Sequence, residues 1–189
     1  NMREKFLELI KRELDNAVEG KEAKIIMKLN SLVDPAIICA LYEASNFGVE
    51  IKLIIRGVCS LVPGVKDLSE NIEVRSIVGR YLEHSRVFYF YNDGANEIYL
   101  SSADMMQRNL DRRVEVAFPI ENPRLKDELI KTLIKVALRD NVKARILQTD
   151  GSYKMAETKV ANKKVNSQEW LMNHALKAMG VRTKKPFEK

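Results

Sequence analysis

The stretch that decides the fold is KIIMKLNSLVDPAIICALYEASNFGVEIKLIIRG, residues 24–57. It begins and ends with short apolar runs rich in β-branched residues, which are typical of buried strands. Between them, Asp34 is suited to cap a helix whose first position is Pro35, and Gly48 is suited to end it. Parallel strands joined through a helix form a right-handed crossover unit. The sequence therefore predicts the centre of an α/β domain.

The rest of the chain continues this alternation. Apolar side chains recur at helical spacing over residues 2–20, and Asp93-Gly94 lies between two strand-like runs as in a hairpin turn. A second hairpin is expected around Asp150-Gly151. The full expectation is a mixed sheet flanked by helices, with further strands over 72–79, 86–92, 97–103, 112–120 and within 143–157, and further helices over 122–140 and 166–180.

Composition restricts the class of protein. The chain has 189 residues, of which 46% are hydrophobic and 31% are charged, a balance typical of one soluble globular domain. No apolar run approaches the roughly 20 residues that a membrane-spanning helix needs, and no secretory signal is recognisable. The two cysteines, Cys39 and Cys59, form no CxxC motif, so we expect buried free thiols rather than a zinc site.

Positive charge is concentrated near the C-terminus. The net charge of +6 arises within residues 154–189, which hold nine Lys or Arg and three acidic residues. Such a segment attracts polyanions in general, whether nucleic acid, anionic membrane or polyphosphate. A merely solvated basic terminus is the alternative. We expect residues 2–181 to form the domain and residues 182–189 to form a basic tail.

A scarce histidine introduces the candidate chemistry. In RYLEHSRVFYF, residues 80–90, His84 and Arg86 stand two positions apart, so a strand would place them on the same face. Histidine exchanges a proton near neutral pH, and arginine binds phosphate through a planar fork of donors. The pair therefore suits phosphoryl chemistry, in which catalysis is mostly positioning and charge stabilisation.

Other polar residues follow predicted strand ends, where the ligands of open α/β sheets gather. The segment 99–113 adds hydroxyl, amide and guanidinium groups that suit a bound phosphate or its support. The candidates are Lys28, Asn30 and Ser31 after the first strand, Arg56 after the second, and Ser101, Ser102, Arg108 and Asn109, beside Asp104 and Asp111, in the later segment.

These residues also have a structural interpretation. A lone His-x-Arg pair is a weak signal, Arg56 would equally well pair with a buried acid, and adjacent serines are common in turns. We interpret His174 as structural, and the aromatic run 88–91 as core packing rather than a base-stacking platform. The functional interpretation depends on several strand ends meeting at one place.

Long segments of the chain resemble the C-terminal domain of bacterial polyphosphate kinase, family 1. The segments are KLNSLVDPAIICALYEAS (28–45), IRGVCSLVPGVKDLSENIEVRSIVGRYLEHSRVFYF (55–90), YLSSADMMQRNLDRRVEVAFPI (99–120) and NSQEWLMNHAL (166–176). The resemblance itself runs over nearly the whole chain, from about residue 5 to about residue 175. The resemblance implies a phospholipase D-like fold, the second of two such domains in tandem.

The resemblance also implies an activity. It is that of a phosphotransferase that moves the terminal phosphate of ATP reversibly to inorganic polyphosphate, through a phosphohistidine in the preceding domain. This sequence lacks that domain, so we expect the chain alone to be inactive. Mg²⁺ is the expected cofactor of the whole enzyme, with its ligands outside this sequence. The expected partners are ATP or ADP, polyphosphate and the preceding domain, in a homo-oligomeric cytoplasmic enzyme that associates peripherally with membrane and needs no nucleic acid.

Two positions match the family's nucleotide contacts. Arg56 in IIRG matches its nucleotide-binding arginine, and His84 in YLEHSR matches its second active-site histidine, a general acid/base or a group that steadies the phosphates. Phospholipase D enzymes usually carry His-x-Lys, and Arg86 replaces the lysine here. That departure fits a half-site for phosphate binding and proton handling, and it leaves open whether His84 is ever phosphorylated.

Two other functions stay open. A phospholipase D-like nuclease or phosphodiesterase would join the His84 strands of two copies in a homodimer. A polyanion-binding module would use the basic tail, with steep salt dependence and an affinity that is insensitive to His84.

Overall fold

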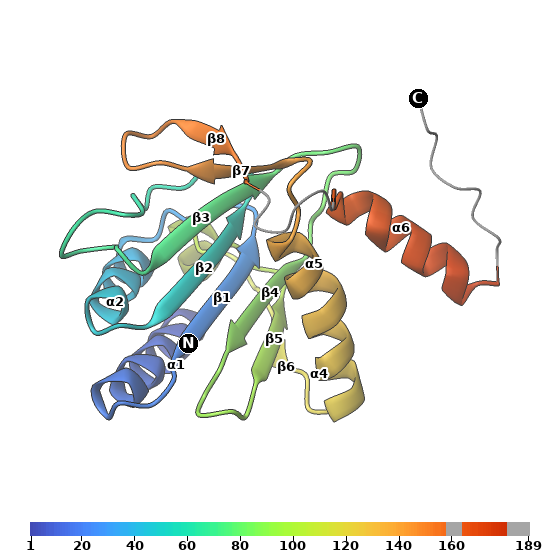
Figure 1. Cartoon of the computed structure of the whole chain (residues 1–189). Coiled ribbons are helices and arrows are strands. Elements are labelled where there is room, and N and C mark those ends of the chain that lie inside the picture. Colours follow the sequence, from blue (N-terminus) through green and yellow to red (C-terminus); the bar gives the residue numbers. More distant parts are fainter. Residues whose placement is uncertain (158–163, 181–189) are drawn as a thin grey trace.

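The computed structural model describes residues 1–157 and 164–180. Within these residues, strands form an 8-stranded sheet in the order β6-β5-β4-β1-β2-β3-β7-β8, with helices on both faces (Figure 1). The strands are β1 (Lys24–Leu29), β2 (Glu50–Ile55), β3 (Ile72–Ile77), β4 (Arg86–Phe90), β5 (Glu97–Ser101), β6 (Ala117–Pro119), β7 (Ala144–Leu147) and β8 (Tyr153–Met155). The helices are α1 (Met2–Val18), α2 (Pro35–Asn46), α3 (Gln107–Arg112), α4 (Pro123–Leu129), the π-helical turn η1 (Ile130–Ile134), α5 (Lys135–Leu138) and α6 (Ser167–Ala178). The predicted α/β class with a mixed sheet flanked by helices is confirmed.

The predicted crossover unit is the centre of this sheet. Strand β1 pairs parallel with β2, and β2 pairs parallel with β3. The α2 helix that joins β1 to β2 begins as expected, because the side chain of Asp34 accepts a hydrogen bond from the backbone N–H of Ile37 at 3.2 Å and Pro35 follows it. All other pairings in the sheet are antiparallel.

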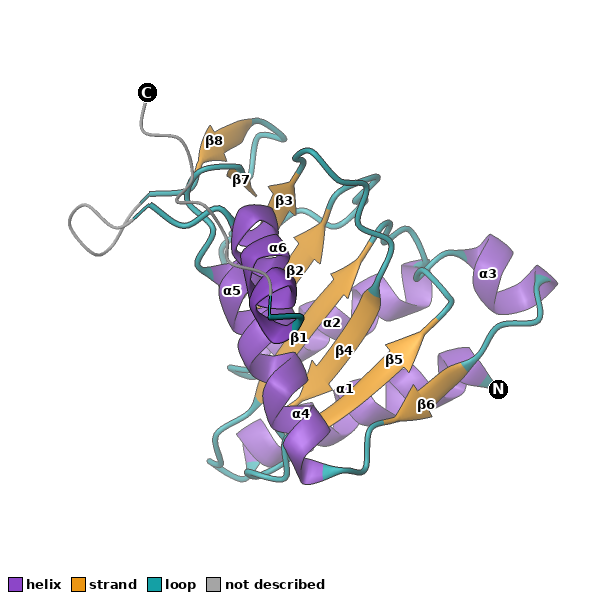
Figure 2. Ribbon diagram, turned by 90° about the vertical axis from the view of Figure 1, so that its right-hand side faces the viewer, coloured by secondary structure: helices purple, strands orange, loops and turns teal. Residues whose placement is uncertain are grey.

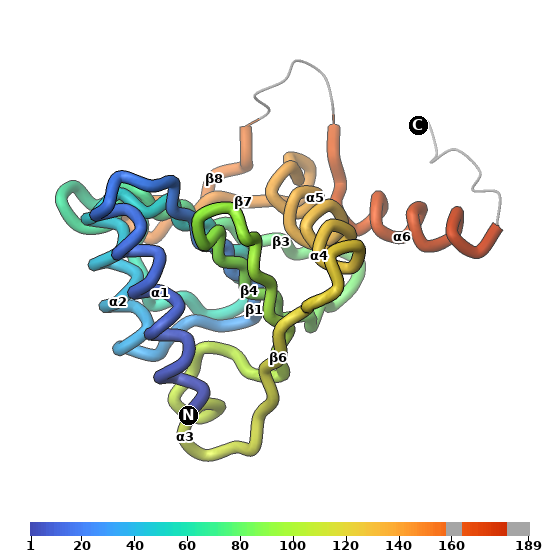
Figure 3. Tube along the Cα trace, turned by 90° about the horizontal axis from the view of Figure 1, so that it is seen from below, coloured from blue at the N-terminus to red at the C-terminus, as the bar shows by residue number. Residues whose placement is uncertain are grey.

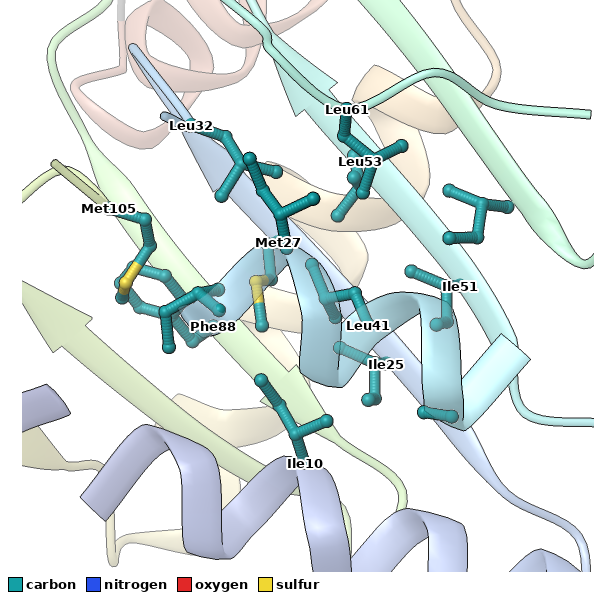
Figure 4. Packing of buried hydrophobic residues seen from close by; sticks show 14 of the residues in the cluster. Ile10, Ile25, Met27, Leu32, Leu41, Ile51, Leu53, Leu61, Phe88 and Met105 are labelled. Atoms are coloured by element: carbon teal, nitrogen blue, oxygen red, sulfur yellow. The ribbon is translucent and has the colours of Figure 1, made fainter. Parts of the chain in front are cut away.

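The main core lies between the sheet and the helices α1 and α2, which cover one face together (Figure 3). Figure 4 shows apolar side chains from β1, β2, β4 and both helices filling this layer. Phe6 of α1 packs on Phe88 of β4 with ring centroids 4.5 Å apart. Each such buried side chain contributes about 1.5–3 kcal/mol through the area it removes from water. The predicted core role of the aromatic run is confirmed for Phe88, Tyr89 and Phe90, all of them buried.

The opposite face carries α4, η1 and α5 (Figure 2). Ile26, Tyr89 and Ile134 belong to the smaller core that forms there. From β3, the buried Arg75 donates a hydrogen bond from Nη1 to the carbonyl oxygen of Ala137 at 3.3 Å and another to that of Leu138. These carbonyls lie at the end of α5, so a strand residue caps the helix.

The segment before β6, an outer strand of the sheet, differs from its prediction. A strand was expected over 112–120, but β6 covers only Ala117–Pro119 and the short helix α3 precedes it. The sequence of α3 lacks a capping side chain and a clear apolar stripe, which is why periodicity did not reveal it. The predicted helix over 122–140 is present with the π-helical turn inside it.

Three smaller expectations have different outcomes. Both predicted hairpins are present, as β4–β5 and β7–β8. The prediction of buried thiols is wrong for Cys39, which is exposed, and Cys59 is half-buried. The end of the predicted domain at residue 181 and the basic tail over 182–189 lie outside the described residues.

Candidate functional site at the carboxyl edge of the sheet

The topology brings several polar strand ends to one edge. Because β1 and β2 run parallel, Asn30 and Arg56 follow their carboxyl ends side by side. Strand β4 runs antiparallel to β1 and starts there with Arg86. Strand β5 ends there, since Ser101 is the partner of Arg86 in the β4–β5 register. The expected convergence of these strand ends is therefore present.

Asp104 is the buried centre of this edge. Its Oδ1 accepts hydrogen bonds from the backbone N–H groups of Asn30 at 2.7 Å and Ser31 at 3.2 Å, and its Oδ2 accepts one from Nη2 of Arg86 at 2.8 Å. Burial raises the pKa of this carboxyl, but the donors from Arg86 and the two amides outweigh it and hold the pKa below its ordinary value. Asp104 is therefore ionised at neutral pH.

His84 lies directly beside Arg86, although not for the predicted reason. It precedes β4 in an exposed loop rather than sharing a strand with Arg86. Nη1 of Arg86 lies 3.0 Å from Nδ1 of His84, and Nη2 lies 3.4 Å from Nε2. The guanidinium, which can only donate, thus lies against the imidazole along both ring nitrogens. The exposed imidazole is held beside a cation at the edge of the sheet.

Arg56 is held through one nitrogen only. Its Nε donates to Oδ1 of Asn30 at 2.6 Å and to the carbonyl oxygen of Glu83 at 2.7 Å. Within residues 1–157 and 164–180, neither terminal nitrogen of the guanidinium has a partner. Arg56 therefore keeps its planar pair of donors available for an anion. The structural alternative, pairing with a buried acid, does not apply among the described residues.

The loop before β4 is fixed from both sides. Lys28 donates from Nζ to Oγ of Ser85 at 3.0 Å and forms an ion pair with Glu83 at 2.8 Å. From the start of α6, Gln168 donates to the carbonyl oxygen of Tyr81 at 2.8 Å and to Glu83 at 3.0 Å. Lys28 is thus a support of the loop rather than an open cation.

The remaining candidates separate into supports and outliers. Ser101 donates to the carbonyl oxygen of Val116 at 2.9 Å, and Ser102 bonds Glu115. Asn109 also bonds Glu115, at 2.5 Å. These side chains hold the segment between α3 and β6 against the end of β5, and this agrees with the turn interpretation of the serines. Arg108 lies exposed on α3 with no hydrogen bond or ion pair to another described residue.

Sequence reasoning named Asp104 without a role and missed Glu83 and Gln168. An aspartate two positions after the hydroxyl pair at the end of β5 was the available signal for Asp104. The contact of Gln168 with Glu83 spans 85 positions, and nothing in the local sequence of either residue indicates it. His174 stacks on Trp170 with ring centroids 4.9 Å apart on α6, which agrees with its structural interpretation.

A cleft of about 400 Å³ lies elsewhere, between the helical layer of α4, η1 and α5 and the opposite end of β1 and β2. Lys24, Lys52 and Tyr91 are among the residues that line it, and none of the predicted site residues does. The candidate site residues therefore lie outside this cleft, at the other end of β1 and β2.

The edge does not fit a magnesium ion. Its two carboxylates, Asp104 and Glu83, are each paired with a cation, Arg86 and Lys28. Across the described ranges there is no group of three or more His, Cys, Asp or Glu residues placed to hold a metal. Mg²⁺ prefers carboxylate, phosphate and water oxygens, so we derive no step through a metal on this chain.

The fold and this edge define an α/β domain that presents cationic and N–H donors at the end of a parallel strand pair, an arrangement suited to a phosphate group. The family model of the polyphosphate kinase C-terminal domain 2 matches residues 1–168. The chain belongs to this family.

Individual relatives agree with the family. The chain is 57% identical to the polyphosphate kinases of Burkholderia ambifaria and Burkholderia multivorans over 150 residues, which are 79% of this chain and 22% of each relative. The crystal structure of polyphosphate kinase from Porphyromonas gingivalis superposes with a TM-score of 0.89 at 40% identity, over 95% of this chain and 27% of that chain. The chain thus spans 22% to 27% of the length of these relatives.

The comparison with phospholipase D is weaker. The family member Nuc from Salmonella typhimurium matches with a TM-score of 0.45 at 20% identity over 63% of this chain. This likeness is too distant to support a homodimeric nuclease. No helix in residues 1–157 and 164–180 is long and apolar enough to span a membrane.

Proposed function

We propose that this chain supplies one half of the phosphoryl-transfer site of a polyphosphate kinase. In the proposed reaction, a histidine nitrogen of the preceding domain attacks the γ-phosphorus of ATP, and the bond to the β–γ bridging oxygen breaks to release ADP. A terminal oxygen of polyphosphate then attacks the phosphohistidine, the P–N bond breaks, and a new phosphoanhydride forms. Both steps run in reverse when ADP accepts the phosphate.

The observation that carries this proposal is the pair of available donors at the carboxyl edge. The free terminal nitrogens of Arg56 would bind non-bridging oxygens of the nucleotide's phosphates in a bidentate manner. The exposed imidazole of His84 would donate a hydrogen bond to the phosphoryl group in transfer, or exchange a proton with it. Both neutralise charge that gathers on oxygen in the transition state. A direct contact between Arg86 and phosphate stays a prediction. In this chain the guanidinium already contacts His84 and Asp104.

The other expectations belong to the whole enzyme. We propose that Mg²⁺ is held by residues outside this chain and by the nucleotide's phosphates, and that the preceding domain closes the site from the side of His84. Partners are ATP or ADP and polyphosphate, and nucleic acid has no role. A homo-oligomeric cytoplasmic enzyme with peripheral membrane association remains our expectation for the parent protein.

Calorimetry with ATP and with tripolyphosphate tests the proposal. We expect weak binding to this chain that falls at least about tenfold, or about 1.4 kcal/mol, in Arg56→Ala and in His84→Ala. His174→Ala is the matched control, since it removes the chain's other histidine, which stacks on Trp170 in α6. Unchanged affinity in both edge variants would contradict the proposal. Loss of binding only on deletion of residues 182–189 would instead favour the polyanion-binding module.

A further inference from the structure

A buried carboxylate, a guanidinium and the exposed imidazole are connected in series at the edge. Oδ2 of Asp104 accepts from Nη2 of Arg86 at 2.8 Å. Nη1 of the same guanidinium lies 3.0 Å from Nδ1 of His84 and donates to its carbonyl oxygen at 3.1 Å. We propose that Asp104 is a positioning residue that acts through Arg86 to fix the orientation of the His84 ring. The inference deepens the proposed function and rests on it for its catalytic meaning.

The first member of the series is immobile. The side chain of Asp104 is 9% exposed, and backbone amides of Asn30 and Ser31 hold its Oδ1. Those amides belong to the end of β1 in the middle of the sheet. A carboxylate fixed by main-chain donors offers its second oxygen at a defined point, and Arg86 binds there.

The second member is committed to this contact. The side chain of Arg86 is only 10% exposed, and its buried Nε has no hydrogen-bond partner among the described residues. An unsatisfied buried donor lowers stability, so the guanidinium is held in place at some expense to the fold. Buried polar groups retained in this way are found at functional positions. The guanidinium spans the space between the fixed carboxylate and the exposed ring.

The third member of the series is His84, and its ring is held in place by Arg86. An exposed histidine in a loop otherwise rotates freely. Here Nη1 and Nη2 of Arg86 lie 3.0 Å and 3.4 Å from the two ring nitrogens, and the bond from Nη1 to the carbonyl oxygen of His84 fixes the loop as well. A preorganised donor needs no reordering when charge develops on a phosphate oxygen. Asp104 therefore contributes to the reaction without touching the substrate.

Relaxation measurements on the His84 ring of this chain test the positioning directly. The chain has two histidines, so His174→Gln assigns the signal. We expect a rigid ring in this chain and a fall of its order parameter to below about 0.6 in Asp104→Asn. Glu13→Gln is the matched control, since Glu13 is also a buried carboxylate bound to backbone N–H groups, at the other end of β1. It should leave the ring rigid.

A second variant and a kinetic measurement complete the test. Arg86→Met removes the connecting group and should release the ring even if Asp104→Asn does not fold. In the full-length parent enzyme, Asp104→Asn should lower kcat about tenfold and leave KM for ATP within about twofold, because positioning acts on the transition state. A ring that stays rigid in folded Asp104→Asn or Arg86→Met overturns the inference. That result leaves the proposed function standing if Arg56→Ala and His84→Ala still lose phosphate binding.

Discussion

Gly57 marks the closest approach between the ends of β1 and β2. Its backbone N–H donates to the carbonyl oxygen of Asn30 at 2.8 Å. A Cβ at this position would lie 2.7 Å from that same oxygen and 3.1 Å from Oγ of Ser31. The residue after Arg56 is thus a glycine because there is no space for a Cβ beside the backbone of Asn30.

We therefore expect Gly57→Ala to lower the free energy of unfolding by about 1–3 kcal/mol, since overpacking against backbone forces the strands apart. The shift of Asn30 would also release Nε of Arg56 and weaken ATP binding. Gly94→Ala provides the contrast, because that glycine has nothing within 4 Å and a φ of +90°, so it should cost about 1–2 kcal/mol through backbone strain alone. Urea unfolding and calorimetry on both variants distinguish the two effects. Normal ATP affinity in Gly57→Ala would contradict the expectation.

At the residue scale, the sequence predicted which polar residues lie together at the carboxyl edge. It did not predict which of them support the site and which keep free hydrogen-bond donors. Asn30, Arg56 and Arg86 lie together because strand direction alone brings them to one edge. Which of them would keep free donors depends on contacts such as that of Nε of Arg56 with the carbonyl oxygen of Glu83. Such contacts arise from three-dimensional packing and leave no local pattern. The binding roles of these residues stay predictions.

The helix α6 is attached to the domain by its first turn. Asn166 caps it, accepting from the backbone N–H of Glu169 at 3.3 Å, and Gln168 is buried against the loop before β4. The rest of the helix extends away from the sheet in two views (Figures 1 and 3). The first turn of α6 therefore supports the loop before β4, which carries His84.

Replacing that first-turn amide should loosen the loop that carries His84. In Gln168→Ala, the hydrogen bonds to Tyr81 and Glu83 are lost, and we expect faster hydrogen exchange of the Tyr81 amide and weaker ATP binding. The global stability should fall by about 1–3 kcal/mol. Lys177→Ala in the last turn of the same helix is the control. Equal exchange rates in the two variants would show that α6 does not support the loop.

Elements with strong local signals were predicted well, and the others were not. The caps Asp34 and Asn122 set the starts of α2 and α4 as expected. Helix α3 was missed because neither a cap nor an apolar stripe marks it. The π-helical turn between Ile130 and Ile134 was missed because its extra residue arises from packing within a helix of ordinary composition.

For the whole molecule, buried aspartates connect segments that lie far apart in the chain. Asp140 is almost fully buried and accepts from the backbone N–H groups of Lys143 at 2.7 Å and Ser167 at 2.7 Å. Burial raises the pKa of this carboxyl, but the N–H donors outweigh it and the pKa lies below its ordinary value. Asp104 is in the same situation at the edge.

The lowered pKa values define a pH dependence. The ionised carboxylates stabilise the fold above the unfolded-state pKa of about 3.9, and this contribution is lost as pH falls through the lower folded-state values. We expect Asp140→Asn to be less stable at pH 7 by about 1–3 kcal/mol, with a smaller further loss in acid than the parent chain. Urea unfolding from pH 7 down to below about pH 3.9 measures the stability at pH 7 and its loss in acid. The exposed Asp127→Asn is the control. Identical acid slopes for Asp140→Asn and the parent would contradict the assignment.

A second whole-molecule prediction concerns activity. Since the proposed nucleophile lies in the preceding domain, this chain alone should form no polyphosphate from ATP. A fragment of the parent enzyme that ends where this chain begins should recover activity when the two are mixed, and should fail to do so with His84→Ala. The His174→Ala chain should restore activity normally. Polyphosphate synthesis by the unmixed chain would show that the division of labour is wrong.

The two outer strands of the sheet are its shortest, since β6 and β8 have three residues each. Strand β6 ends at Pro119, which has no backbone N–H to offer. Long open strands recruit other chains and lead to aggregates, whereas short strands interrupted by proline resist this. We therefore expect this chain to stay dispersed at high concentration rather than associate with other chains edge to edge.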